Sequence, residues 1–146
     1  MANEVPYAFP VELLSGTHDF ATDTFKLALY TANPYTQSTS TVYVATSESS
    51  GTEYSAGGNT LAGNAVSNVA DIATVDFTDS VWGSPTPATF SAAYGTIYNS
   101  SASNKLVVVL DFGGTKSCSN GTFTVTFPDP TSGSPSGADA LLSITS

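Results

Sequence analysis

Charged residues are scarce in this chain, and positive ones are nearly absent. They make up 10% of the 146 residues, against roughly 25% in an average soluble domain. Twelve carboxylates face only Lys26, Lys105 and Lys116, with no arginine, so the formal net charge is −9. Such a chain cannot neutralise many phosphates, so neither nucleic acid nor an anionic membrane surface is an expected partner. The acidity serves solubility, or it docks the protein onto a basic surface.

Cysteine and histidine each occur once, which removes most thiol and metal chemistry. Cys118 has no partner for an internal disulfide, and one thiol cannot build a thiolate metal site within one chain. It lies in a polar stretch, residues 116–121, that is typical of a surface turn. We expect no chemical role for Cys118, and no metal ion or other cofactor.

Long apolar runs are also missing. No segment approaches the roughly 20 apolar residues of a membrane span. Residues 1–7 lack the basic region and apolar segment of a signal peptide. We therefore expect a protein that is made in a cytoplasm and does not use a membrane.

Serine and threonine take the place of the missing charges and form more than a quarter of the chain. Hydroxyl side chains are unfavourable inside helices but acceptable in turns and on the outer face of a strand. Apolar residues alternate with polar ones in several short segments, bounded by Gly, Pro and Asn, as in strands. Strands are expected at residues 25–30, 60–66, 72–77, 88–98, 105–112, 122–127 and 140–145. Residues 105–112 are apolar on both faces, which predicts a central, covered strand.

This pattern predicts an all-β fold, a β-sandwich of about seven or eight strands with one or two short helical turns. The turns are expected at residues 11–16 and within 36–50. The immunoglobulin Cys–Trp–Cys pattern is absent, so a jelly-roll-like sandwich is preferred. At this length one domain is expected, and we assign it to residues 12–146.

Residues 1–11 are predicted to be an extended N-terminal arm, because Pro6 and Pro10 disfavour a regular helix or a central strand. The arm carries Val5, Tyr7 and Phe9. Either these side chains pack on a neighbouring subunit, or the arm folds over its own core. Both interpretations are open, and Val5, Tyr7 and Phe9 are the predicted interface residues.

Catalytic candidates are few. His18 beside Asp19 would suit a general base with an orienting carboxylate, but a polar pair at the exit from a helical turn is the favoured interpretation. Three carboxylate pairs would suit a glycosidase, but all six residues lie near turns, where Asp and Glu bind backbone amides locally. The pairs are Asp19 with Asp23, Glu48 with Glu53, and Asp76 with Asp79. We expect no enzyme activity and no catalytic residue.

Aromatic residues, 11% of the chain, would form a carbohydrate platform only if several rings were exposed in a row. The candidates are Tyr30, Tyr35, Tyr43, Tyr54, Tyr94 and Tyr98. Most fall in expected strands, where burial in a core or an interface is the simpler explanation. Trp82 lies in an expected turn, Asp79 to Gly83, and we expect it to plug the core beneath a loop.

Several segments, in their order and spacing, resemble small tailed-phage virion structural proteins, several of which are capsid cement (decoration) proteins. These segments are residues 13–16, 23–29, 51–61, Trp82, 94–98, 110–114 and 120–125. The resemblance implies a jelly-roll-like subunit on the exterior of an icosahedral head, with the major capsid protein as partner and a homotrimer at local threefold positions. It brings no catalytic residues. The arm before residue 12 and the Gly/Ser/Pro segment after Pro130 depart from the family pattern and leave the attachment surface open.

Two other functions are considered. One is a tail or fibre-associated module that binds host glycans, and the other is a hydrolase that degrades the cell envelope. No segment of the sequence favours either, so the expected location is the capsid exterior of a virion assembled in a bacterial cytoplasm.

Overall fold

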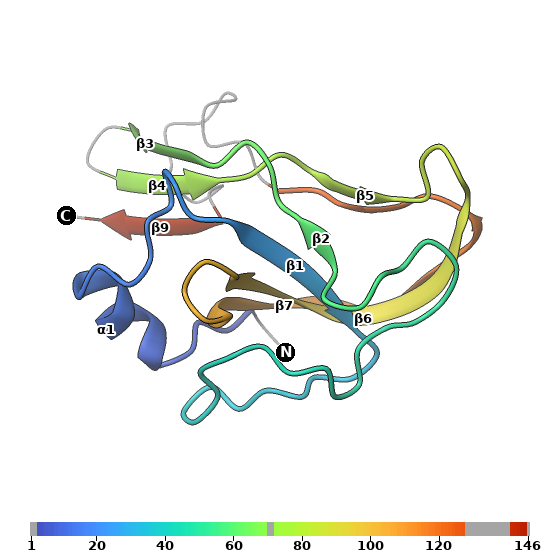
Figure 1. Cartoon of the computed structure of the whole chain (residues 1–146), viewed down its shortest axis with the longest axis horizontal. Coiled ribbons are helices and arrows are strands. Elements are labelled where there is room, and N and C mark those ends of the chain that lie inside the picture. Colours follow the sequence, from blue (N-terminus) through green and yellow to red (C-terminus); the bar gives the residue numbers. More distant parts are fainter. Residues whose placement is uncertain (1–2, 70–71, 128–140, 146) are drawn as a thin grey trace.

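The computed structural model describes residues 3–69, 72–127 and 141–145, which form an antiparallel β-sandwich (Figure 1). The prediction of an all-β sandwich is confirmed, while the jelly-roll connectivity stays a prediction. The elements in chain order are α1 (Ala8–Leu14), β1 (Phe25–Tyr30), β2 (Asn59–Thr60), β3 (Ala65–Val69), β4 (Ile72–Asp76), β5 (Ser80–Trp82), β6 (Ala88–Asn99), β7 (Lys105–Gly121), β8 (Phe123–Val125) and β9 (Leu142–Thr145).

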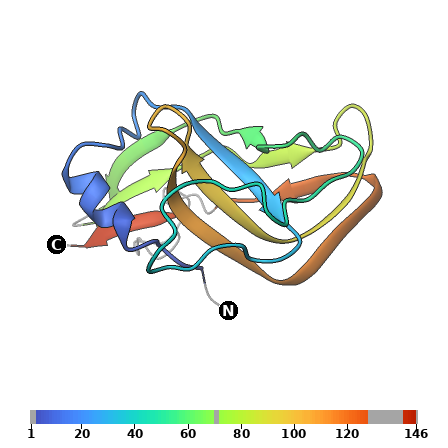
Figure 2. The same cartoon turned by 60° about the horizontal axis from the view of Figure 1, so that its bottom comes forward.

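One layer is a four-stranded sheet in the order β2-β1-β6-β7, and β3-β4-β9 with the pair β5-β8 lies across from it. Strands β4 and β5 follow each other along the chain, with β9 beside the first and β8 beside the second. The chain passes between the layers after β2, after β5 and after β7. Helix α1 lies at the same end of the sandwich as β9 in both views (Figure 1 and Figure 2).

The core strand β1 is buried on both faces, not half-buried as the alternating pattern suggests. Phe25, Leu27 and Leu29 face the main core. Ala28 and Tyr30 face a second cluster to which the following loop contributes Tyr35 and Tyr43. Coverage by a loop therefore accounts for the apolar residues on the second face.

Strand β7 is covered, as expected, but it is not central. Residues Leu106 to Leu110 are buried, yet β7 ends the four-stranded sheet. Its outer edge is met instead by single bridges, from Val42 at Lys105 and from Glu4 at Val109. The Glu4 bridge is reciprocal, with both N–H···O distances 2.8 Å.

Other strand boundaries differ from the prediction because pairing partners change. The expected strand at 60–66 is split into β2 and β3, which pair with β1 and β4 in different layers. Strand β7 continues to Gly121, so Cys118 pairs with Phe90 inside a strand and not in a surface turn. The Gly/Ser/Pro segment after Pro130 lies outside the described residues, as does the predicted start of the last strand at residue 140.

Trp82 lies in β5, where its pairing with Phe123 replaces the expected turn. Its side chain packs in the main core and is 3% exposed. The expectation of a core residue is confirmed, but its placement in a loop is wrong.

The extended arm is the clearest error, because α1 begins at Ala8. Pro10 is tolerated because it is the third helical residue after the N-cap Tyr7, and N–H groups in the first turn have no intrahelical acceptor. The helix ends just before Gly16, which has φ of 75°. The helical turn expected at 11–16 therefore exists but starts three residues earlier.

Candidate functional site

The predicted interface residues are separated by the structure. Phe9 is 5% exposed and belongs to the main core, and Val5 packs against that core. Gln37 holds this segment in place, since its side-chain Nε2 donates to Val5 O and its backbone carbonyl accepts from Tyr7 N, both at 3.0 Å. For Val5 and Phe9 the alternative of a segment folded over its own core is the one observed. Tyr7 alone points outward, with 64% of its surface exposed.

Tyr7 belongs to an apolar surface that the sequence analysis missed. Val11 is 67% exposed and Leu14 is 90% exposed, and with Tyr7 they stand at positions i, i+4 and i+7 of one helix face. We call these three residues the α1 stripe. Their spacing can be recognised in the sequence if a helix is assumed, but Pro6 and Pro10 led to the prediction that no helix forms there.

The acidic residue of α1 is turned away from the stripe. Glu12 Oε1 lies 2.7 Å from Lys105 Nζ, Glu12 Oε2 lies 3.3 Å from His18 Nε2, and the Glu12 side chain is 13% exposed. These contacts tie α1 to the start of β7. The stripe is therefore uncharged and sits on a helix held firmly against the sandwich.

His18 does not form the expected pair with Asp19. Its ring is buried between Glu12 and Asn99, whose Nδ2 lies 3.2 Å from His18 Nδ1. The Asp19 carboxylate instead accepts from Thr22 Oγ1 at 2.8 Å and from Ala21 N at 2.9 Å. These hydrogen bonds, that from Thr22 first, lower the pKa of Asp19. The expected polar pair of His18 and Asp19 is therefore wrong, and His18 instead contacts Glu12 of α1 and Asn99 at the end of β6.

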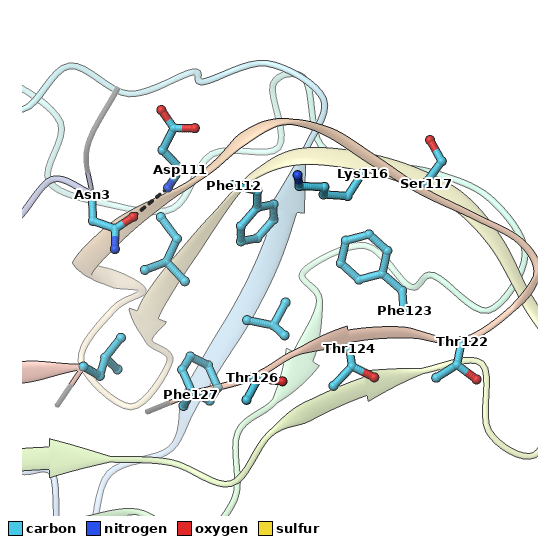
Figure 3. Close-up of a pocket in the computed structure, with 13 residues that line it drawn as sticks. Asn3, Asp111, Phe112, Lys116, Ser117, Thr122, Phe123, Thr124, Thr126 and Phe127 are labelled. Atoms are coloured by element: carbon cyan, nitrogen blue, oxygen red, sulfur yellow. Dashed lines mark hydrogen bonds between the residues drawn. The ribbon is translucent and has the colours of Figure 1, made fainter. Parts of the chain in front are cut away.

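A groove of about 590 Å³ opens between β7 and β8 (Figure 3). Its apolar lining comes from both strands, from a residue shortly after β8 and from the residue just before β9. These residues are Leu110, Phe112, Phe123, Val125, Phe127 and Leu141. Phe112 and Phe123 approach across it with ring centroids 6.4 Å apart. We call this feature the β7–β8 groove.

The groove follows from a break in the pairing of β7. Tyr94 pairs with Asp111 and Ala92 pairs with Lys116, so residues 112–115 of β7 stand opposite Ala93 alone. Gly113 and Gly114 supply the positive φ values, 69° and 123°, that such a bulge uses. In the described chain, β8 pairs with β5 and with no second strand. As far as the described residues go, the open side of the sandwich therefore lies between the bulged β7 and the edge of β8.

The six candidate tyrosines do not line up as a surface platform. Tyr30, Tyr35 and Tyr98 are buried, and the other three are partly buried. Two of them converge on Glu48, which accepts from Tyr43 Oη at 2.6 Å and from Tyr54 Oη at 2.8 Å. The rings and this carboxylate bind the loop before β2 to β1.

The buried tyrosines predict alkaline unfolding. Burial first, and then the negative charge of Glu48, raises the pKa of Tyr98 to about 12 from 10.0, and burial also raises the pKa values of Tyr43 and Tyr54. In the unfolded chain these phenols ionise at their ordinary pKa, so stability is complete below pH 10 and falls as the pH rises toward 12. Ultraviolet absorbance and circular dichroism, followed together through this range, should show late phenol ionisation coinciding with loss of structure. Ionisation of all tyrosines near pH 10 with the fold intact would contradict this.

Comparison with known proteins gives no match for the chain, whether with protein-family models, curated proteins or solved structures. Over residues 3–69, 72–127 and 141–145, no three His, Cys, Asp or Glu side chains gather closely enough to hold a metal ion. In the same residues no helix has the length and apolarity needed to cross a bilayer. The α1 stripe and the β7–β8 groove are two apolar features of the described residues that these comparisons leave unexplained.

Proposed function

We propose that this protein is a capsid cement (decoration) protein of a tailed phage. It binds the exterior of the icosahedral head as a homotrimer, contacts the major capsid protein and stabilises the contacts between capsomers without catalysis. The observation that carries the proposal is the α1 stripe, three exposed apolar side chains on a helix of a chain with net charge −9. Exposed apolar side chains that gather on one element favour an association surface. The family resemblance in the sequence supplies the partner.

A cement protein works through binding free energy alone. A DNA-filled head is under outward stress, and a ligand that binds only assembled capsomers stabilises the assembled state. A trimer binds through several contacts at once, so modest individual contacts add up to strong attachment. Repetition over equivalent sites multiplies the effect over the whole shell.

The described fold suits a protein that holds neighbouring capsomers together, because the fold is stiff. The hairpin of β6 and β7 has strands of 12 and 17 residues, and the centre of the sheet is buried on both faces. Helix α1 is fixed to this sheet by the Glu12–Lys105 contact of 2.7 Å. A surface carried on a rigid support loses little conformational entropy when it binds.

Substituting the stripe should weaken binding to heads. Val11→Lys places a charge on the stripe and should reduce the affinity for DNA-filled heads at least about tenfold, as expected for a central apolar contact. Sedimentation of phage heads lacking the protein, mixed with recombinant protein and quantified by gel, measures this. Val66→Lys is the matched control, because Val66 is 58% exposed on β3 and undergoes the same substitution away from the stripe.

Failure of the unsubstituted protein to bind heads in stoichiometric amounts would reject the proposal. Equal losses of head binding in Val11→Lys and Val66→Lys would show that the stripe has no specific part in binding heads. Point substitutions are preferable to deletion of residues 2–10, because deletion would also remove buried Pro6 and Phe9. Localisation to the tail, with sugar binding on a glycan array, would favour the glycan-binding alternative.

A further inference from the structure

We propose that the α1 stripe of one copy docks into the β7–β8 groove of a second copy, so that subunits join head to tail into a closed ring. The inference rests on the trimeric part of the proposed function and is independent of capsid binding. It assigns the stripe to the neighbouring subunit, so the loss of head binding expected for Val11→Lys would follow from loss of the trimer's multivalent attachment.

The stripe has the form of a helix-in-groove ligand. Tyr7, Val11 and Leu14 occupy positions i, i+4 and i+7, which is the anchor spacing of amphipathic helices that bind apolar grooves. Seven residues of helix separate the outer anchors by about 10 Å along the axis. Phe9 is buried in the core beneath, so the helix is already ordered before it binds.

The groove has the form of a matching receptor. Its floor holds the rings of Phe112 and Phe123, and its volume of about 590 Å³ falls within the range of ligand pockets, about 300–1,000 Å³. Hydroxyl groups of Thr122, Thr124 and Thr126 stand along the β8 side (Figure 3). An apolar floor with a polar rim is the usual anatomy of a protein interface.

The charge distribution is compatible with a second copy as the occupant. Two copies of a −9 chain repel each other, so they can associate closely only where few acidic groups meet. The stripe is uncharged, and among the described residues the groove is lined by one carboxylate, Asp111, and one ammonium, Lys116. The molecule thus carries a convex and a concave apolar surface that are both close to neutral.

The two surfaces differ, which makes the contact heterologous. A contact between unlike patches closes into a ring or extends into a filament. In a ring every subunit uses both of its surfaces, so each subunit has two contacts.

Complementary variants test this arrangement. Leu14→Lys damages the stripe and leaves the groove intact, while Thr124→Lys damages the groove and leaves the stripe intact. Both residues are exposed, so the fold should persist, which circular dichroism verifies. In a ring made of one variant alone, every contact contains the substituted residue. Self-association of that variant should therefore weaken at least about tenfold, so that it is a monomer at concentrations where the unsubstituted chain is a trimer. An equimolar mixture retains one intact contact and should form dimers but no trimers, as read by native mass spectrometry.

The controls separate this inference from the proposed function. Val66→Lys should leave the trimer unchanged. Retention of the trimer by either variant alone, or a mixture that stays monomeric, would overturn head-to-tail docking. An unsubstituted protein that is monomeric yet decorates heads would also reject the docking while the cement function stands. A trimer that ignores heads would reject the cement function and leave the docking intact.

Discussion

Replacing Gly58 by alanine should prevent the chain from forming a stable sandwich. Gly58 has φ of 72°, and a Cβ built there would collide with the carbonyl oxygen of Leu27 and lie 2.6 Å from Ala28 Cα. Both contacts are to the backbone of β1, a buried core strand, so no flexible side chain can move aside. We expect a loss of more than about 4 kcal/mol, which approaches the whole stability of many domains, about 5–15 kcal/mol. The yield of soluble protein and urea unfolding would measure it.

Gly16→Ala is the matched control for this prediction. Gly16 has nearly the same φ, 75°, but an added Cβ meets nothing within 4 Å. Only the backbone preference is then lost, which costs about 1 kcal/mol. The difference between the two variants isolates the collision with β1, so similar losses in both would show that the close approach has no consequence.

Much of the β-structure was predictable because its signals are local. Alternating residues bounded by turn formers placed β1 and β6 within a residue or two of their observed bounds. The burial of both faces of β1 was not predictable, because its second face is covered by Tyr35 and Tyr43 from a later loop. Such coverage depends on how a loop folds back over the sheet, and the periodicity of apolar residues within the strand does not predict it.

Two errors have a common cause, which is pairing between distant residues. Trp82 is in a strand because β5 pairs with β8, which lies more than forty residues later in the chain. Cys118 is in a strand because β7 resumes pairing with β6 after its bulge, from Lys116 opposite Ala92 to Cys118 opposite Phe90. Locally both segments contain turn formers, and the gain in backbone hydrogen bonds and core contacts outweighs that preference.

The two candidate surfaces differ in how far the sequence reveals them. The spacing of Tyr7, Val11 and Leu14 is visible once Pro10 is accepted in a first helical turn. The groove is assembled from Asn3, β7, β8 and Leu141, which are spread over nearly the whole chain. A surface of that kind appears only when the tertiary pairing is known.

Replacing Glu48 by alanine should lower the free energy of unfolding by about 3–5 kcal/mol. The carboxylate accepts hydrogen bonds from Tyr43 Oη at 2.6 Å, Tyr54 Oη at 2.8 Å and Gly57 N at 2.7 Å. Hydrogen bonds to a charged group contribute about 1.5–3 kcal/mol each, and their loss leaves partly buried donors without an acceptor. Glu48→Gln keeps one acceptor oxygen in a similar shape and should cost about 1–2 kcal/mol. Urea unfolding of both variants would give this ranking.

The structural consequence of losing Glu48 should reach β1. Tyr54 Oη also accepts from the backbone N–H of Leu29 at 2.9 Å, so the carboxylate, the phenol and the strand form one connected chain of hydrogen bonds. In Glu48→Ala the amide of Leu29 should therefore exchange with solvent deuterium faster than in the unsubstituted protein, by more than global destabilisation accounts for. Glu53→Gln, on an exposed side chain of the same loop, should change stability by less than about 0.5 kcal/mol. A Glu48→Ala protein as stable as Glu53→Gln would show that the tyrosines, and not the carboxylate, hold this loop against the sheet.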